Sequence, residues 1–399
     1  MSWDKVKLAD CCLSISDGDH QPPPKAVSGV PFVTIANINK SNQFDFSDTM
    51  FVPKDYYDRL DSKRKAQVGD ILYSVVGSFG IPVLIKEERP FVFQRHIAIL
   101  RPNERINSAF LYYTMLSRDF YAKADAAAIG AAQRTVSLTS LRGMEIELPP
   151  LKVQETIASK LSVYDNLIEN NQKQIKLLEE AARRLYKEWF VNFRFPGYED
   201  TPIVDGVPEG WEKAPIDSRI SLLSGYAFKS AQFDSSGEYK IVTIKNVKDG
   251  EFDGINTNRI VSIPGKMPKH CVLTDGDILL SLTGNVGRTC IVNGNNYLLN
   301  QRVAKLQSDI PAFTYCLFRS SDMFDAMNNL ANGTAQQNLS PIRTGKISIL
   351  FPADNLLEEF ERIVGSMISK MLSLIKQCDL LIQARDRLLP KLMSGEIEV

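Results

Sequence analysis

The feature that most constrains how this chain can fold is an internal repeat. The stretch GDILYSVVGSFG, from Gly69 to Gly80, returns as GDILLSLTGNVG, from Gly276 to Gly287, with seven of its twelve positions identical. Other segments, such as VTIANI with VTIKNV and GAAQRTVSL with GTAQQNLSP, match in the same order at offsets between 203 and 209 residues. The 399-residue chain is therefore predicted to hold two copies of one unit of about 190 residues each.

Two copies are too few for a solenoid, so we expect two separate globular domains, at residues 1–150 and 211–355. Within each copy, short β-rich runs such as VPFVTIANI and IPVLI are bounded by Gly, Pro or Asp and predict strands. The segment 108–127 predicts one amphipathic helix. The expected fold class is therefore α+β, with two tandem pseudo-symmetric domains.

The end of each copy has a different pattern, which predicts a long helix. Between Pro150 and Pro196 there is no Pro or Gly, and the candidate seam positions alternate in steps of four and three residues. The first seam comprises Ile157, Leu161, Tyr164, Ile168, Asn171, Ile175, Leu178, Ala182, Leu185 and Trp189. The second, at an offset of 203, comprises Phe360, Val364, Met367, Met371, Leu374, Cys378, Leu381, Arg385, Leu388 and Leu392. Such a pattern is typical of a coiled coil.

We therefore expect helices over residues 151–193 and 356–399, packed on each other as an antiparallel coiled-coil spacer. Each would be roughly 60 Å long at 1.5 Å per residue. Asn171, at a seam position, is expected to fix the register of the pair. The alternative is that each helix packs independently on its own domain. Residues 194–210 are rich in Pro, Gly and acidic side chains and predict a linker.

Composition limits the classes of function. The chain has 47 basic and 47 acidic residues, which argues against a polycationic nucleic-acid binder but allows local basic surfaces. Neither a secretory signal nor a run of about 18 apolar residues is present, so no membrane span is expected. The six cysteines include no CxxC pair and the three histidines are scattered, so we expect no zinc site and reduced thiols in a cytoplasmic protein.

The sequence lacks the usual signatures of an enzyme. It has no GxxxxGK[ST], HExxH or GxSxG motif, and ELPPL at residues 147–151 is not the Asn/Asp-Pro-Pro-aromatic loop of adenine methyltransferases. A catalytic site present in both copies would repeat its acid–base residues, yet the histidines at positions 20, 96 and 270 are not equivalent in the repeat. We therefore predict no catalytic residue.

Polar motifs that recur in both copies are the candidates for binding. Gln and Arg side chains can pair with adenine and guanine edges, and glycine-rich loops can present backbone N–H groups to phosphates. The alternatives are ordinary strand-to-strand turns, solvent-exposed side chains and structural hydrogen-bonding groups. The candidate nucleic-acid contacts are Lys25, Arg64, Lys65, Ser78, Arg95, Gln133, Arg134, Lys229, Lys245, Asn285, Arg288, Arg302, Gln336 and Gln337.

The chain resembles the specificity subunits of type I restriction-modification systems over essentially its whole length. The resemblance is carried by DGDHQPPPKAVSGVPFVTIANI (17–38), LPPLKVQETIASKL (148–161), EEAARRLYKEWFVNFRFPGYE (179–199), VPEGW (207–211), SGYAFKS (224–230) and LLPKLMSGEIEV (388–399). These motifs are individually soft, but their order and their duplication are specific to the family.

The resemblance implies that residues 1–150 and 211–355 are target recognition domains, each of which reads one half of a bipartite site in double-stranded DNA. It implies that the two helices set the spacing of the half-sites and dock two modification subunits, which bind S-adenosylmethionine and methylate adenine. Restriction subunits would complete the endonuclease, which defends against foreign DNA. The specificity subunit itself is non-catalytic, so no cofactor and no metal are expected on this chain.

The family has no fixed base-contacting positions, so the candidate contacts remain hypotheses. Candidate surfaces for the partner subunits lie at the two helix ends; the alternative is burial against the neighbouring domain. These candidates are Tyr186, Trp189, Phe190, Leu389 and Leu392. Two other classes of function stay open at this point: a protein–protein scaffold without a DNA-reading role, and an autonomous enzyme such as a nuclease.

Overall fold

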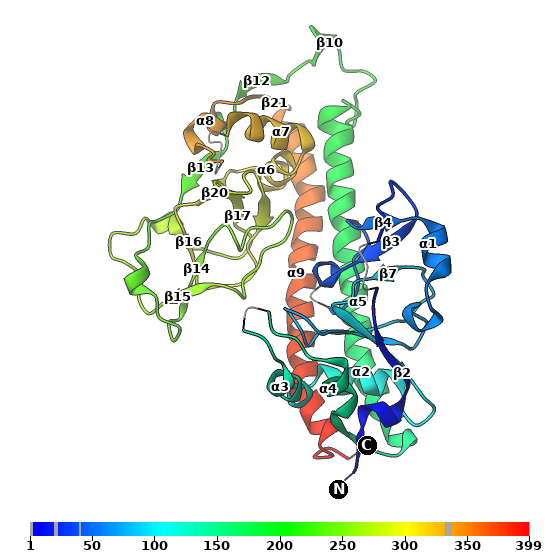
Figure 1. Cartoon of the computed structure of the whole chain (residues 1–399). Coiled ribbons are helices and arrows are strands. Elements are labelled where there is room, and N and C mark those ends of the chain that lie inside the picture. Colours follow the sequence, from blue (N-terminus) through cyan, green and yellow to red (C-terminus); the bar gives the residue numbers. More distant parts are fainter. Residues whose placement is uncertain (1–2, 20–22, 40, 132, 332–336, 399) are drawn as a thin grey trace. The chain divides into compact units, whose positions relative to one another are not determined.

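A computed structural model describes residues 3–19, 23–39, 41–131, 133–331 and 337–398. The chain divides into two compact units (Figure 1). Unit 1 comprises residues 1–170 and 379–399, and unit 2 comprises residues 171–378. Each unit therefore contains one copy of the repeat together with a segment of both long helices.

Unit 1 is built on a four-stranded antiparallel sheet of order β2-β8-β5-β6, a three-stranded sheet of order β4-β3-β7 and a two-stranded sheet of β1 and β9. The strands are β1 (Asp4–Lys7), β2 (Cys12–Asp17), β3 (Val30–Val33), β4 (Met50–Val52), β5 (Ile71–Ser74), β6 (Pro82–Leu84), β7 (Val92–Phe93), β8 (Ile97–Pro102) and β9 (Glu145–Leu148). The helices are α1 (Lys54–Arg59), α2 (Ser108–Leu116), α3 (Arg118–Ala127), α4 (Leu138–Gly143) and the start of α5 (Leu151–Tyr186).

Unit 2 has the corresponding sheets, of order β13-β20-β17-β18, β15-β14-β19-β16 and β12-β21, and a hairpin of β10 and β11 precedes them. The strands are β10 (Ile203–Val204), β11 (Val207–Pro208), β12 (Glu212–Pro215), β13 (Ser221–Ser224), β14 (Tyr239–Val242), β15 (Asn258–Ile260), β16 (Val272–Leu273), β17 (Ile278–Ser281), β18 (Thr289–Ile291), β19 (Tyr297–Leu299), β20 (Val303–Gln307) and β21 (Ser348–Phe351). The helices are α6 (Pro311–Phe318), α7 (Ser321–Leu330), α8 (Pro341–Gly345) and most of α9 (Asp354–Met393).

The predicted repeat is confirmed by strand pairing. In both units the first and last strands of the copy pair antiparallel, as β1 with β9 and β12 with β21. In both, one parallel pair occurs at the same place in the order, β3 with β7 and β14 with β19. The α+β class expected for each copy is therefore correct.

The single helix predicted over residues 108–127 is wrong, because Ser117 divides it into α2 and α3. Ser117 has φ −66° and ψ 149°, outside the helical region, and its hydroxyl accepts a hydrogen bond from the N–H of Phe120, which caps α3. Ser320 divides α6 from α7 in the second copy and caps α7 through Met323 in the same way. The apolar pattern continued across the break, whereas the cap that interrupts it is a single serine.

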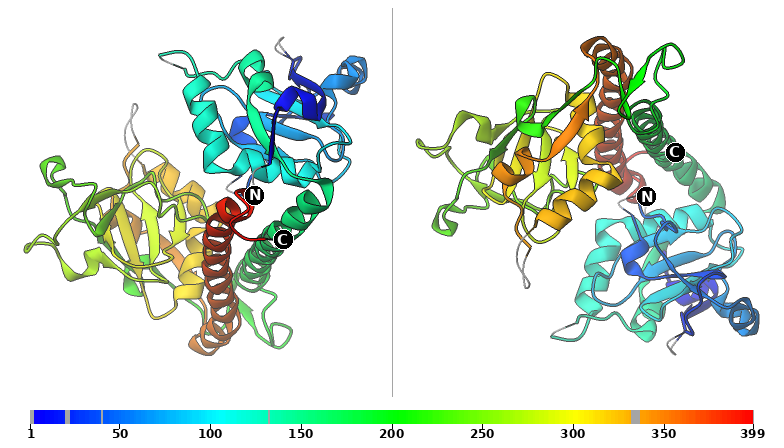
Figure 2. Two further views of the ribbon diagram at one scale, coloured as in Figure 1. Left: turned by 90° about the horizontal axis from the view of Figure 1, so that it is seen from below. Right: turned by 90° about the horizontal axis from the view of Figure 1, so that it is seen from above.

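The two long helices pack antiparallel through the predicted seams. In unit 2, Asn171 of α5 meets Gln377 of α9, and Tyr186 near the end of α5 meets Phe360 near the start of α9, with ring centroids 6.3 Å apart. All twenty seam positions are buried or half-buried. Figure 2 shows α5 and α9 running side by side. Asn171 is buried and its amide donates to Gln377 at 3.4 Å, as expected of a polar seam residue that specifies register.

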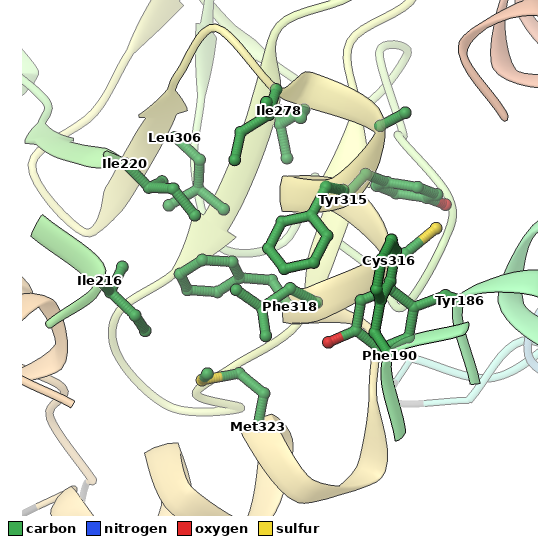
Figure 3. Close-up of a cluster of buried hydrophobic side chains, with 14 of the residues drawn as sticks. Tyr186, Phe190, Ile216, Ile220, Ile278, Leu306, Tyr315, Cys316, Phe318 and Met323 are labelled. Atoms are coloured by element: carbon green, nitrogen blue, oxygen red, sulfur yellow. The ribbon is translucent and has the colours of Figure 1, made fainter. Parts of the chain in front are cut away.

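The end of α5 leads into an aromatic core in unit 2. A π-helical turn, Lys187–Val191, follows α5 and buries Trp189 and Phe190. Between ring centroids, Phe190 lies 4.8 Å from Phe360 and 5.1 Å from Phe313. Figure 3 shows Phe190 beside Tyr186, with ring centroids 5.5 Å apart. The predicted linker is more ordered than expected, because its segment IVDGVP forms the β10–β11 hairpin. Asp205 and Gly206 both have positive φ in its two-residue turn.

Among the residues that the structure describes, no helix combines the length and the apolar character needed to span a membrane.

Candidate nucleic-acid interface

Backbone hydrogen bonds join three loops of unit 1 into one surface region, which we call loop cluster 1 (residues 75–80, 94–96, 129–131 and 133–136). Val75 donates to the carbonyl of His96 and Gly77 donates to the carbonyl of Arg134, both at 2.9 Å. Val136 donates back to Val75 at 2.9 Å. Three segments that are far apart in the sequence, each with a repeated motif, therefore come together.

Unit 2 forms the equivalent loop cluster 2 (residues 282–287, 300–302 and 337–339) with the same bonds. Leu282 donates to the carbonyl of Arg302 at 2.9 Å, and Gly284 donates to the carbonyl of Gln337 at 3.2 Å. Leu339 donates to Leu282 at 2.7 Å. The two clusters thus share a backbone frame although their side chains differ.

The paired glycines of these loops have separate roles. A Cβ on Gly80 would lie 2.5 Å from the ring of Tyr121 on α3, and one on Gly287 would lie 3.2 Å from Met327 on α7. The second glycine of each pair therefore makes room for a helix. A Cβ on Gly77 would lie 3.7 Å from Nε2 of Gln133 and one on Gly284 would lie 3.4 Å from Cδ1 of Ile244, which are ordinary contact distances, so it is the positive φ of 70° and 73° that favours glycine at these positions.

The structure brings seven of the predicted contact residues into the two clusters: Arg134, which is ion-paired with Asp125, and six others. Each of the six side chains is exposed. They are Ser78, Arg95 and Gln133 in loop cluster 1, and Asn285, Arg302 and Gln337 in loop cluster 2. These groups are placed where they can meet a ligand without rearrangement of the fold.

Arg134 also lies in loop cluster 1, but its guanidinium has partners within the chain. It forms an ion pair with Asp125 of α3 and lies 5.4 Å from the ring centroid of Phe79. Arg288 is half-buried, and its N–H donates to the hydroxyl of Ser281. Gln336 lies outside the described residues.

The other predicted contacts fall outside the hydrogen-bonded loops. Arg64 is held 3.5 Å from Asp19, whose carboxylate also accepts the hydroxyl of Tyr56. Burial, and then the hydrogen bond to Asp19, raise the pKa of Tyr56 to about 12, so its hydroxyl stays a donor at neutral pH. Lys65 donates to the carbonyl of Asp58. Lys25, Lys229 and Lys245 are exposed.

Sequence reasoning missed an aromatic residue beside each cluster. Tyr121 on α3 is 47% exposed and stacks on Phe79 with ring centroids 5.8 Å apart. Phe324 on α7, at the equivalent position 203 residues later, is 44% exposed. The signal was available, because an aromatic recurs at the same place of both copies. It was hidden by the assumption that these residues belonged to the apolar face of one helix.

The side chains predicted to contact partner subunits are buried in the cores of their own units. Tyr186, Trp189 and Phe190 belong to the core of unit 2, and Leu389 and Leu392 belong to the core of unit 1. The structure therefore gives them the packing role that the sequence left open as the alternative.

Within the described ranges, the remaining ionisable groups assemble neither a metal centre nor a thiol of lowered pKa. No group of three or more His, Cys, Asp or Glu side chains suited to a metal ion occurs among residues that the structure describes. The six cysteines are free thiols. Burial raises the pKa of Cys12 to about 12 and also raises the pKa values of Cys290 and Cys316.

Comparisons with known proteins agree with this arrangement. A family model described as the type I restriction modification DNA specificity domain matches twice, at residues 2–180 and 208–367. The MjaIX type I restriction enzyme specificity subunit of Methanocaldococcus jannaschii is 25% identical over 346 residues, which cover 83% of this chain and 78% of that protein. The HindI specificity subunit of Haemophilus influenzae is 21% identical, with 99% of each chain covered.

A solved structure has the same fold. The crystal structure of a type I restriction-modification system S subunit from M. genitalium superposes with a TM-score of 0.56 at 16% identity, and the match covers 98% of this chain and 96% of that one.

Proposed function

Because this chain belongs to the type I restriction-modification DNA specificity family, we propose that loop clusters 1 and 2 each read one half of a bipartite site in double-stranded DNA. The observation that carries the proposal is the duplicated frame. The same backbone bond runs from Gly77 to Arg134 in one cluster and from Gly284 to Gln337 in the other, and the side chains of Gln133 and Gln337 in these loops are exposed. Glutamine pairs bidentately with adenine in the major groove, and the guanidinium groups of Arg95 and Arg302 can hydrogen-bond to phosphates or to guanine.

The differences between the clusters support two different half-sites. Ser78 in loop cluster 1 is replaced by Asn285 in loop cluster 2, and Arg134 is replaced by Gln337. Side chains that differ on a common frame would select different bases in the same manner. The balanced charge of 47 basic and 47 acidic residues fits a reader whose phosphate contacts come largely from partner subunits.

The proposal includes the other subunits of the system. The paired helices α5 and α9 would set the spacing of the half-sites and dock two modification subunits, which carry S-adenosylmethionine and methylate adenine. Restriction subunits would join this complex in the cytoplasm to form the endonuclease. Exposed residues at the helix ends, rather than the buried Tyr186, Trp189, Phe190, Leu389 and Leu392, would then meet the partners.

The first test is a map of methylated adenines across the host genome with the gene intact and deleted. Loss of one bipartite motif on deletion is the expected result and would define both half-sites. Survival of every motif, together with no sequence-selective DNA binding by the chain reconstituted with its modification subunit, would contradict the proposal.

Point variants assign the clusters. Gln133→Ala should relax selectivity in one half-site only, and Gln337→Ala in the other, because each residue lies in a separate unit. Gln67→Ala, which removes an exposed glutamine that lies in neither loop cluster and at neither helix end, is the matched control. Equal loss at both halves from either glutamine variant would contradict the assignment.

A further inference from the structure

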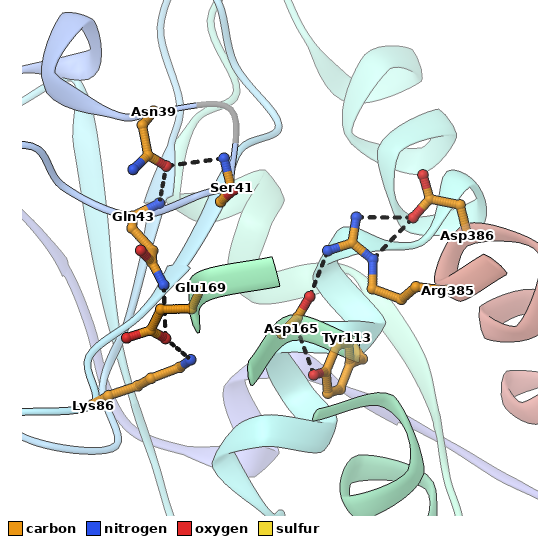
Figure 4. A network of polar contacts seen from close by, with 9 residues as sticks. All are labelled: Asn39, Ser41, Gln43, Lys86, Tyr113, Asp165, Glu169, Arg385 and Asp386. Carbon is orange, nitrogen blue, oxygen red and sulfur yellow. Dashed lines mark hydrogen bonds and ion pairs between the residues drawn. The ribbon is translucent and has the colours of Figure 1, made fainter. Parts of the chain in front are cut away.

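Asp165 on α5 joins three elements of unit 1. Its Oδ2 accepts a hydrogen bond from the hydroxyl of Tyr113 on α2 at 2.7 Å, and its Oδ1 accepts one from Nη1 of Arg385 on α9 at 2.6 Å. Figure 4 shows the three side chains pointing toward one another. One carboxylate therefore ties the globular part of unit 1 to both long helices.

This contact is buried, whereas a neighbouring one is not. Tyr113 is 2% exposed, and the side chains of Arg385 and Asp165 are 10% and 16% exposed. Glu169, one helical turn further along α5, accepts from Lys86 and Gln43, but the Lys86 side chain is 43% exposed. Exposed pairs contribute little to orientation, whereas a buried, fully bonded group tolerates few alternative geometries.

The electrostatics of the buried contact are also satisfied. Burial disfavours the charged form of Arg385, but Asp165 and then Asp386 outweigh it and raise the pKa of the guanidinium. Burial, and then the charge of Asp165, raise the pKa of Tyr113, so its hydroxyl remains a hydrogen-bond donor. The group is thus a fixed polar contact inside an apolar core.

Unit 2 contains a second contact of this kind, also on α5. Glu179 accepts a hydrogen bond from the hydroxyl of Tyr315 on α6 at 3.3 Å and forms an ion pair with Arg319. Tyr315 is almost fully buried, as is the side chain of Arg319. The same three kinds of group meet in each unit: a carboxylate on α5, a tyrosine of the globular part, and an arginine, which comes from α9 in unit 1 and from the end of α6 in unit 2.

The repeat does not explain this pair of contacts. At an offset of 203, the positions equivalent to Asp165 and Glu179 are Ile368 and Ile382 of α9, which carry no charge. Tyr315 is equivalent to Tyr112 rather than to Tyr113. The two contacts therefore use residues that are not equivalent in the repeat. Both carboxylates lie on α5, whereas a contact related to that of Asp165 by the repeat would have its carboxylate on α9.

We propose that Asp165 and Glu179 are positioning residues that fix the orientation of each recognition domain on α5, so that the gap tolerated between the half-sites depends on them. The inference rests on the proposed function. Apolar packing alone permits small rotations of a domain on a helix, whereas a hydrogen bond to a buried carboxylate oxygen selects one orientation. The loop clusters would determine which bases are read, and the two carboxylates would determine the length of the gap between the half-sites.

The test removes one oxygen atom from each contact in the chain reconstituted with its modification subunit. Tyr113→Phe and Tyr315→Phe keep the ring and its packing but delete the hydrogen bond. Tyr73→Phe is the matched control, because the buried hydroxyl of Tyr73 has no hydrogen-bond partner among the residues that the structure describes. Glu179→Gln gives a second variant that keeps the shape of the side chain.

Methylation is measured on DNAs that carry the native half-sites with the gap changed by one or two base pairs, and on DNAs with one half-site base changed. We expect the preference for the native gap to fall roughly tenfold in Tyr113→Phe and in Tyr315→Phe, as for a lost hydrogen bond to a charged group. Discrimination against a changed base should stay within about twofold of that of Tyr73→Phe.

Each outcome bears on a separate statement. A gap preference that is unchanged in both tyrosine variants overturns the inference while the proposed function stands. A parallel loss of gap preference and base discrimination also overturns it, because the contacts would then act through the stability of the loops. A wild-type complex that methylates no bipartite site contradicts the proposed function itself.

Discussion

The ion pair between Asp165 and Arg385 predicts a large and specific loss of stability when one partner is removed. Arg385→Met deletes the guanidinium but keeps most of the aliphatic stem, so Asp165 remains buried with the hydroxyl of Tyr113 as its only close partner from this group. Breaking a buried pair in this way costs about 3–5 kcal/mol of the free energy of unfolding. Because Asp165 keeps one hydrogen bond and 16% of its side-chain surface in water, we expect about 3 kcal/mol.

A double change separates the charge from the packing. Asp165→Leu with Arg385→Met replaces the pair by apolar side chains, and it should be more stable than Arg385→Met alone because no uncompensated charge stays buried. The matched control is Arg59→Met, which breaks the pair with Asp55 whose side chains are 75% and 71% exposed. It should cost less than about 1 kcal/mol.

The assay is urea unfolding of the full chain followed by circular dichroism, with amide hydrogen exchange to assign the transition to unit 1. The reasoning would be refuted if Arg385→Met were as stable as Arg59→Met. It would also be refuted if the double variant lost more free energy of unfolding than the two single variants lose together, because the ion pair would then not be the source of the loss.

Three further outcomes follow from the same contacts. Phe360→Ala should lower the free energy of unfolding by about 3–5 kcal/mol, because Phe360 is fully buried among Tyr186, Trp189 and Phe190. Urea denaturation measures this loss, and a smaller loss would mean that the surrounding side chains move in to fill the cavity. At pH 8 the half-buried Cys12 thiol, with a pKa of about 12, has a thiolate fraction of about 1 in 10,000, so its modification by iodoacetamide should be slow until the chain unfolds or the pH approaches 12. Mass spectrometry follows the labelling, and rapid labelling at pH 8 would contradict the raised pKa. Insertion of four residues near Leu178 should lengthen α5 by about 6 Å and change the gap in the methylated motif, whereas an unchanged gap would show that the helix does not set it.

The architecture was predictable wherever a pattern repeats many times. The heptad spacing runs through twenty seam positions, so single exceptions such as Asn171 and Arg385 did not obscure it. The duplicated motifs likewise predicted which loops carry the candidate contacts. The backbone bonds from Gly77 to Arg134 and from Gly284 to Gln337 then showed that these loops meet.

Features that depend on one residue, or on a partner far away in the sequence, were not predictable. Ser117 ends α2 through its backbone conformation and caps α3, but a single serine within an apolar pattern is not enough to predict a helix cap. Asp165 and Glu179 look like ordinary exposed positions of a helix. Their partners Arg385 and Arg319 lie 220 and 140 residues later in the chain. From the sequence alone, Trp189 and Phe190 resemble an exposed apolar surface for a partner at the end of a helix. The structure shows instead that they are buried in the core of unit 2.

The division of the long helices between the two units has a consequence during synthesis. Residues 1–170 of unit 1 are synthesised first, but the core and the ion pair of this unit also need Arg385, Leu389 and Leu392 from residues 379–399. Arg385 follows Asn170 by 215 residues, so at about 5–20 residues per second the ribosome delivers it roughly 10–45 s later. During that time the unit 1 segment of the α5 seam lacks the last part of α9, which belongs to the same unit. The repeat that is translated first is therefore the last to finish folding, and a chain cut short by even 20 residues would release it incomplete.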